Sequence, residues 1–233
     1  MNKLKVLAMS DLHGKLPAPE DLPKTDLVAI AGDISPIRIE KNMPSMLEWL
    51  AGDFAEWAKR IDAATVFLVA GNHDFVFADK EFSEGAKFTL LQMTRGKCKY
   101  LQDEFMEVEG KIIYGSPWVV GPKGFAFVDP KLDRIIGTMP ERADLAILHQ
   151  PLKSCENGMV HDSYSFEHAD FGSSLLDEIV AAKGPRHIVT GHTHTGNHNM
   201  GSIPTAKGTS VFWNVSILDE EYKMTYEPLL FEI

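Results

Sequence analysis

The stretch Val66-Phe67-Leu68-Val69-Ala70-Gly71-Asn72-His73-Asp74 joins an uninterrupted apolar run to a glycine and three polar side chains. A short, largely aliphatic run of this kind is typical of a strand that is buried on both faces. The glycine permits a tight turn, so the amide, imidazole and carboxylate groups come directly after the strand. The stretch therefore predicts a central strand of an α/β sheet with chemically active side chains at its carboxyl end.

Four more apolar runs end in the same manner. They are residues 4–9 before Asp11 and His13, 27–31 before Asp33, 145–148 before His149, and 187–190 before His192 and His194. Because ligands of open α/β sheets collect at the carboxyl ends of the strands, we expect these side chains and Asn72 to meet at one edge. In extended backbone, residues two apart point to the same side, which would let Asp11 and His13 face one pocket, and likewise His192 and His194.

The segments between these runs predict the remaining elements. Apolar residues at helical spacing predict helices over residues 44–60, 82–93 and 173–183. Residues 105–108 and 111–114 flank Glu109-Gly110, which predicts a tight hairpin, and residues 211–215 and 222–233 are predicted to be late strands. We find no repeat and no linker, so this mixture predicts packed sheets with helices outside, in a single domain over residues 1–233.

The composition narrows the class of protein. The chain has 233 residues, of which 44% are hydrophobic, as expected for a globular domain. Its net charge of -10 repels a polyanion, which disfavours a general nucleic-acid binder. No stretch has the pattern of a membrane span or a signal peptide. Cys98 and Cys155 match no zinc or disulfide pattern, so we expect reduced thiols in a cytoplasmic protein.

The polar groups at the strand ends form a set of metal ligands. Carboxylate, amide and imidazole groups without a thiolate suit divalent Mn, Fe, Zn or similar ions better than a structural zinc cage. Seven ligands are too many for one catalytic ion, which must keep a position open. They suit two ions about 3.5–4 Å apart that share a bridging carboxylate. The sequence therefore predicts a site for two divalent metal ions.

The motifs resemble those of the calcineurin-like metallophosphoesterases in both identity and order. They are DxH at residues 11–13, GD at 32–33, GNHD at 71–74, a single histidine at 149 and GHTH at 191–194. Each motif alone is common, whereas five in this order over most of the chain are specific. The resemblance implies an α/β fold of the four-layer α/β/β/α sandwich type, with two mixed β-sheets flanked by helices.

The resemblance also implies a role for each residue. One ion would be held by Asp11, His13, Asp33 and His194, and the other by Asp33, Asn72, His149 and His192. A hydroxide that bridges the two ions opposite Asp33 would attack phosphorus. His73 would lie beside the ions without binding them, and would stabilise the transition state or protonate the leaving oxygen, while Asp74 orients its ring.

Two further segments are similar to one branch of that family, which holds the brain metallophosphoesterase-domain proteins and is similar to the class III cyclic-nucleotide phosphodiesterases. They are Tyr114-Gly115-Ser116-Pro117-Trp118 and Asn214-Val215-Ser216. That branch often has His-Gly-Pro-Pro where this chain has His149-Gln150-Pro151-Leu152. Because this loop faces the substrate, the resemblance does not transfer the identity of the substrate.

The positions of two aromatic residues and two histidines in the sequence suggest candidate contacts to the substrate. Trp118 and Phe125 could line a face that binds a base or an aryl group, with loop packing as the alternative. His161 and His168 lie in a polar stretch between two of the motif strands. Residues 152–171 are therefore either a solvated loop or a lid that covers the metals and selects the substrate.

We expect an enzyme, a dinuclear metal-dependent hydrolase of phosphate esters. A phosphodiesterase on a small substrate, with nucleotides among the candidates, is the leading hypothesis, and a phosphomonoesterase stays open. The alternative from another class is a non-catalytic scaffold of the same fold that binds a protein partner, although the complete ligand set and His73 favour catalysis. A nuclease is disfavoured by the acidic balance and by the lack of a Lys/Arg cluster.

Overall fold

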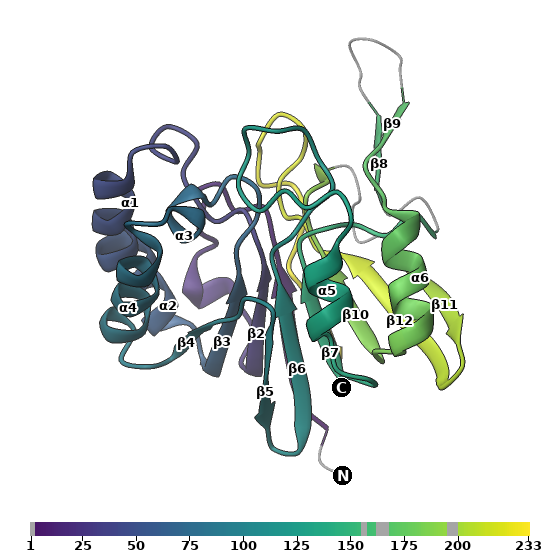
Figure 1. Cartoon of the computed structure of the whole chain (residues 1–233). Helices are drawn as coiled ribbons and strands as arrows, with labels where there is room; N and C mark the ends of the chain where they lie inside the picture. Colours follow the sequence, from purple (N-terminus) through teal and green to yellow (C-terminus); the bar gives the residue numbers. More distant parts are fainter. Residues whose placement is uncertain (1–2, 155–157, 162–167, 195–199) are drawn as a thin grey trace.

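The computed structural model describes residues 3–154, 158–161, 168–194 and 200–233. It contains two large β-sheets that lie face to face, with helices on their outer sides (Figure 1). The first sheet has the order β13-β1-β2-β3-β4. Its strands are β1 (Lys5–Met9), β2 (Thr25–Ala31), β3 (Ala63–Val69), β4 (Cys98–Tyr100) and β13 (Leu229–Glu232). Strands β1 to β4 run parallel, and β13 pairs with β1 in the antiparallel sense.

The second sheet has the order β11-β12-β10-β7-β6-β5. Its strands are β5 (Glu104–Val108), β6 (Lys111–Ser116), β7 (Leu145–Leu148), β10 (His187–Thr190), β11 (Met200–Thr205) and β12 (Gly208–Asn214). Strands β6, β7, β10 and β12 are parallel, while β5 and β11 are antiparallel edge strands. A separate pair, β8 (Met159–His161) and β9 (His168–Asp170), extends from the body of the protein (Figure 1).

Side-chain alternation in the strands creates the layers. In β1, Val6 and Ala8 belong to the apolar core between the sheets, whereas Leu7 and Met9 belong to the core beneath the helices of the first sheet. Each of these residues is almost fully buried, as expected for strands covered on both faces. The four-layer α/β/β/α sandwich is therefore confirmed.

The helices cover the two outer faces. The first sheet is covered by α1 (Met43–Trp49), α2 (Ala55–Arg60), α3 (Phe75–Ala78) and α4 (Ser83–Met93), and the second by α5 (Asp133–Thr138) and α6 (Ser174–Lys183) (Figure 1). The helix predicted over residues 44–60 is present, but a π-helical turn at Leu50–Phe54 interrupts it. The helix predicted over residues 173–183 is confirmed: the Ser173 hydroxyl accepts from Leu176 N–H, and Gly184 ends the helix in the left-handed region.

The late part of the chain differs from the prediction. Of the strand predicted over residues 222–233, only Leu229–Glu232 forms a strand of the sheet. Before it, the carboxylate of Asp219 accepts hydrogen bonds from the backbone N–H groups of Glu221 and Lys223, at 3.0 and 2.8 Å. A side chain that satisfies its own neighbours in this way stabilises a turn in place of a strand. The hairpin predicted around Glu109-Gly110 is confirmed as β5 and β6, with both turn residues at positive φ.

None of the described helices combines the length with the apolar composition that a membrane-spanning helix requires.

A glycine pair tests the backbone of α4 and its end. Gly85 is helical, and an added Cβ would meet no atom within 4 Å, whereas Gly96 has φ +77°. We expect Gly85→Ala to stabilise the fold by about 0.5 kcal/mol, because the unfolded chain loses freedom. Gly96→Ala should destabilise it by about 1 kcal/mol, because a Cβ strains the left-handed backbone. Urea denaturation measures the free energy of unfolding of both variants. A change of the same sign in both would contradict the backbone conformations assigned to the two glycines.

Candidate metal centre

The carboxyl ends of the two sheets meet at one edge of the molecule. Ser10 N, just after β1, donates to Val215 O at 2.9 Å, which joins the first sheet to the second. His149, just after β7, lies with its Nδ1 2.7 Å from the carbonyl oxygen of Ala31 at the end of β2. The loops that follow β1, β2, β3, β7 and β10 therefore converge, although they come from different sheets.

The seven polar side chains singled out in the sequence lie at this edge, but not on extended backbone. Asp11, His13, Asp33 and His192 have φ of 56°, 43°, 53° and 73°. The prediction that each pair faces one pocket through extended geometry is therefore wrong for Asp11 and His13, and for His192. Left-handed residues other than glycine are uncommon, and they concentrate at functional sites because the surrounding structure must hold them there.

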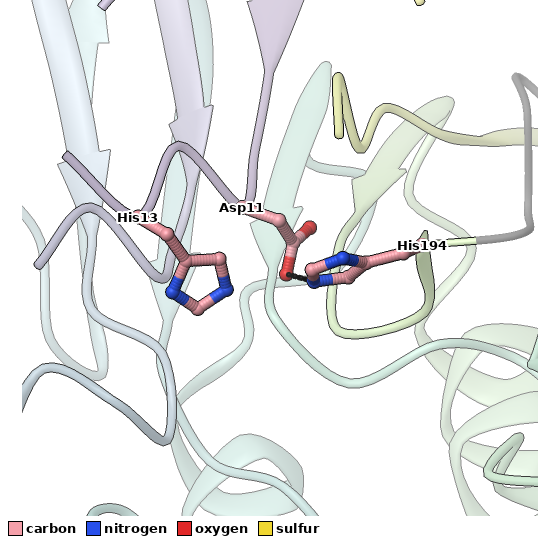
Figure 2. A group of neighbouring side chains, drawn as sticks. All are labelled: Asp11, His13 and His194. Carbon is pink, nitrogen blue, oxygen red and sulfur yellow. Dashed lines mark ion pairs between the residues drawn. The ribbon is translucent and has the colours of Figure 1, made fainter. Parts of the chain in front are cut away.

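One group of donors comprises Asp11, His13 and His194, whose ligand atoms all lie within 4.8 Å of one another. Figure 2 shows the three side chains pointing toward one another from the loops after β1 and β10. His194 Nε2 lies 3.7 Å from Asp11 Oδ1, and His13 Nε2 lies 3.8 Å from Asp33 Oδ2. These separations are too long for hydrogen bonds, but they suit ligands of a shared cation.

A second group of donors lies around Asn72 and also reaches Asp33. His149 Nε2 is 3.3 Å from Asp33 Oδ2 and 3.0 Å from Asn72 Oδ1. His192 Nδ1 is 2.7 Å from the same Asn72 oxygen. Asp33 Oδ2 thus faces a histidine of each group, His13 and His149. Asp11 also belongs near this group, since its carboxylate, Asp33 and His149 place ligand atoms within 4.8 Å of one another.

Backbone carbonyls orient two of the histidines. A carbonyl oxygen only accepts, so His149 donates from Nδ1 to Ala31 O, and His194 donates from Nδ1 to Asp219 O at 3.0 Å. When either ring is neutral, its lone pair is therefore on Nε2, which faces a carboxylate. A histidine that binds a metal through one ring nitrogen usually donates a hydrogen bond from the other, and this bond fixes the tautomer.

Burial and charge set the protonation of the donors. Burial lowers the pKa of His13 and His192 to about 4, which leaves both rings neutral at pH 7. Burial also opposes a charge on His149, but the Asp33 carboxylate outweighs it and raises the pKa of His149 to about 9. Conversely, burial disfavours the ionised Asp33, but His149 holds the pKa of Asp33 well below its usual range. Because a metal ligand is unprotonated, a cation here would take the place of the His149 proton.

The donor set fits divalent cations. Two ligands that each lie about 2.1 Å from one ion are at most about 4.2 Å apart, and the pairwise distances of 2.7 to 3.8 Å given above lie within that limit. His13 is 6% exposed, and its Nδ1 has no hydrogen-bond partner among the described residues. A buried polar atom without a hydrogen-bond partner is costly, so its presence beside the other donors calls for a functional explanation. The chain can therefore hold divalent metal at this edge.

His73 stands beside the donors, and its partner is not the one expected. Its Nδ1 lies 2.8 Å from Glu40 Oε2, and its backbone N–H donates to Asp33 Oδ1 at 2.8 Å. The prediction that Asp74 orients this ring is wrong. Asp74 is fully buried and accepts hydrogen bonds from Ile34 N, Ser35 N, Ser35 Oγ and Gly71 N. Its carboxylate therefore joins the loops after β2 and β3, and Glu40 takes the place that we expected for it.

The space above the donors is a small pocket of about 200 Å³. It is lined by His13, Asp33, Asn72, His73, His192, His194, Glu220 and Tyr222. Tyr222 has φ 58°, and its ring packs edge-on against His13 and His194, with centroids 5.0 Å apart in both cases. Lys15 Nζ donates to Tyr222 O and holds this turn against the loop after β1.

The predicted substrate contacts have different outcomes. Trp118 does not line this pocket: its indole N–H donates to Asp103 Oδ2 at 2.8 Å, and its ring packs edge-on against Phe127. Phe125 lies beside the pocket, with its ring centroid 5.2 Å from that of His73. The side chains of His161 and His168 lie outside the part that the structure describes. At the end of the proposed lid, Phe171 packs edge-on against His192 at 5.7 Å.

Three residues of the site have no signal that sequence reasoning could use. Glu40 lies seven residues beyond Asp33 in an irregular loop. Glu220 and Tyr222 lie in a turn at the point where we predicted a strand to begin.

Gln150 lies in the loop after β7, at the position where the related branch of the family often has glycine. It is fully buried; its Oε1 accepts from Val120 N at 2.6 Å, and its Nε2 donates to Phe171 O at 2.7 Å.

Comparisons with known proteins agree with this fold. The family model described as Calcineurin-like phosphoesterase matches residues 4–196, and the chain belongs to this family. Human metallophosphoesterase domain-containing protein 1 is 25% identical over 98% of this chain and 71% of its own length. The UPF0046 protein C25E10.12 of Caenorhabditis elegans is 25% identical over 100% of this chain and 82% of its own. The solved structure of TT1561 of Thermus thermophilus shares the fold, with a TM-score of 0.58, 12% identity and coverage of 100% and 99%.

Gly71 tests the packing around Asp33. An added Cβ there would lie 2.2 Å from Asp33 Oδ1 and 2.6 Å from Asp33 N. Because both groups are buried, we expect Gly71→Ala to displace the carboxylate and to weaken binding of Mn²⁺ or Zn²⁺ by about 10-fold or more. Gly85→Ala, where the Cβ meets open space, is the matched control and should bind as the wild type does. Titration calorimetry measures both, and wild-type affinity in Gly71→Ala would contradict the assignment.

Proposed function

We propose that this protein is a metal-dependent phosphodiesterase that uses two divalent ions on either side of Asp33. The observation that carries the proposal is the position of Asp33 Oδ2, which faces His13 Nε2 at 3.8 Å and His149 Nε2 at 3.3 Å. One ion would be held by Asp11, His13, Asp33 and His194, and the other by Asp33, Asn72, His149 and His192. Two bound divalent ions would supply a hydroxide nucleophile from a coordinated water and neutralise the phosphoryl oxygens.

The residues of the chain bind and orient the substrate. The pocket of about 200 Å³ above the donors suits a phosphoryl group, and histidine side chains line the pocket on several sides. Among the seven proposed ligands, only Asp11 and Asp33 are negatively charged, and two divalent ions exceed that charge. The site can thus attract an anionic ester although the whole chain carries a net charge of -10.

His73 would act on the leaving oxygen. Because the Glu40 carboxylate accepts from Nδ1, the opposite ring nitrogen faces the substrate, and in the doubly protonated ring its N–H would give a proton or a hydrogen bond to the leaving oxygen. The backbone N–H of His73 is anchored on Asp33 Oδ1, so the ring keeps a constant position relative to the proposed bridging carboxylate. Glu40, with only 12% of its side chain exposed, is a positioning residue for this ring.

Room for two ester groups favours a diester over a monoester. One hollow, of about 420 Å³, adjoins the phosphoryl pocket at His13 and Tyr222. Another, of about 730 Å³, begins at Phe125, which touches the His73 ring. A phosphate with one alcohol on each side would occupy both. Nucleotide esters are among the candidates. A non-catalytic scaffold that binds a protein partner would not require histidines oriented toward a shared carboxylate.

The function and the role of His73 are tested together. We expect the wild type, titrated with Mn²⁺ or Zn²⁺, to hydrolyse bis-p-nitrophenyl phosphate faster than p-nitrophenyl phosphate. His73→Ala should keep its metal content and lose about 10²–10⁴-fold in turnover, because acid–base help to the leaving group is removed. Turnover is followed by p-nitrophenolate absorbance, and metal content by elemental analysis. Metal binding without hydrolysis of either ester would support a scaffold, and loss of metal in His73→Ala would refute the assigned role.

Glu40 is tested by a pair of substitutions. Glu40→Ala frees the His73 ring, so we expect kcat on bis-p-nitrophenyl phosphate to fall by about 10–100-fold, as for other supporting residues of metal sites. Glu40→Gln still offers an acceptor oxygen to Nδ1 and should recover part of that loss. KM and metal content should change little in either variant. If Glu40→Gln were no more active than Glu40→Ala, or if both lost metal, the positioning role would be wrong.

A further inference from the structure

We propose that the leaving group of the substrate is an aromatic alcohol, which binds in the apolar hollow beside Phe125. This inference rests on the proposed function, and it names the class of ester that the site would take. The hollow lies between the start of α3 and the loop over residues 118–130. It is separate from the space above the metal donors, with which it shares no lining residue.

The hollow is large and mostly apolar, and four of its lining residues are aromatic. Its volume is about 730 Å³, within the range of small-molecule sites. Its walls include Phe75, Trp118, Phe125 and Phe127, and the charged side chains among its lining residues are Asp79 and Lys123, one of each sign. A flat apolar group would gain stacking contacts there, whereas a phosphate or carboxylate would find little net charge.

The reaction geometry directs the leaving alcohol toward this hollow. The phosphoryl pocket, at about 200 Å³, has no room for a large alcohol, which must extend outward. The leaving oxygen must lie within hydrogen-bond reach of the His73 ring for that ring to protonate it. Phe125 packs edge-on against His73, with centroids 5.2 Å apart, so an alcohol that passes His73 meets the Phe125 ring.

The chain holds Phe125 in place before any substrate binds. Ala126 N donates to Asn72 O at 3.0 Å, which anchors the loop on the same segment that carries His73. Val120 N donates to Oε1 of the buried Gln150 at 2.6 Å, and Val119 N donates to Phe127 O at 2.9 Å. Phe125 nevertheless remains 40% exposed. A large aromatic side chain that is anchored by its neighbours but left open to solvent offers a ready surface for a ligand.

The hollow on the opposite side has a different character. It adjoins the phosphoryl pocket at His13 and Tyr222, and its lining includes Lys15, Arg38 and Asp53. With a volume of about 420 Å³ and three charged side chains, it suits the retained, more polar ester group. The aromatic leaving group is therefore assigned to the Phe125 side.

Two esters that differ only in the leaving alcohol test the inference. These are methyl p-nitrophenyl phosphate and methyl trifluoroethyl phosphate, with alcohol release followed by absorbance and by fluorine NMR. We expect Phe125→Ala to lower kcat/KM about 10-fold for the aryl ester, and less than about 2-fold for the trifluoroethyl ester. For each ester we compare kcat/KM of the wild type with kcat/KM of the variant, so the intrinsic reactivity of the ester cancels in this ratio. Metal content should be unchanged.

Two control variants locate the effect. Phe88 on α4 is 64% exposed and lines neither hollow, so Phe88→Ala should leave both esters unaffected. Ile37 is 42% exposed and lines the opposite hollow. If Ile37→Ala, and not Phe125→Ala, caused the selective loss on the aryl ester, the aromatic group would bind on the other side and the assignment would be overturned.

A binding measurement separates this inference from the proposed function. Saturation-transfer NMR of p-nitrophenol with the zinc-loaded protein reports occupancy without turnover, and we expect Phe125→Ala to weaken that signal several-fold. If the wild type hydrolysed both esters and Phe125→Ala lowered both equally, the phosphodiesterase would stand and the leaving-group assignment would fall. If the wild type hydrolysed neither ester, the proposed function itself would fail.

Discussion

The hydrogen bond from His149 Nδ1 to the carbonyl oxygen of Ala31 joins the second sheet to the first at their carboxyl ends. A second link, from Ser10 N to Val215 O, closes the same edge. Because both sheets are largely parallel near this edge, several strands end there together, and each strand end carries a polar side chain. A shift of one sheet against the other would separate Asp33 from His149, and the metal donors of both groups would no longer lie close together. The chemistry of the site therefore depends on the register between the sheets.

Concentrating these groups is costly for the metal-free chain. Asp11 and His149 are fully buried, and Asp11, His13, Asp33 and His192 hold left-handed backbone. Burial of a charge is tolerated only when it is paired, and Asp33 and His149 achieve this through each other. The rest of the fold has to supply the stability, and the apolar layers around the strands do so. Buried carboxylates at this edge suit a cation site, since divalent ions stabilise the charge that burial disfavours.

The sequence predicted the central strands, the main helices and the polar residues that come together, because each of these depends on local patterning. It did not predict the π-helical turn at Leu50–Phe54 or the turns before Leu229–Glu232. The carboxylate of Asp219 satisfies the N–H groups of residues 221 and 223, and this local bonding outweighs the apolar character that suggested a strand. The partner of His73 was also assigned wrongly, since Asp74 is next to it in sequence but bonds to the loop after β2.

Sequence alone determined which side chains can carry the chemistry, since each lies directly after a buried run that must end at the sheet edge. Only the tertiary structure decided which of them approach one another, and from which direction. Glu40 reaches His73, and Phe125 borders it, because loops distant in sequence are anchored on the same segment after β3. Such approaches are set by the packing of two sheets and by hydrogen bonds between loops, and a linear pattern of residues carries no record of them.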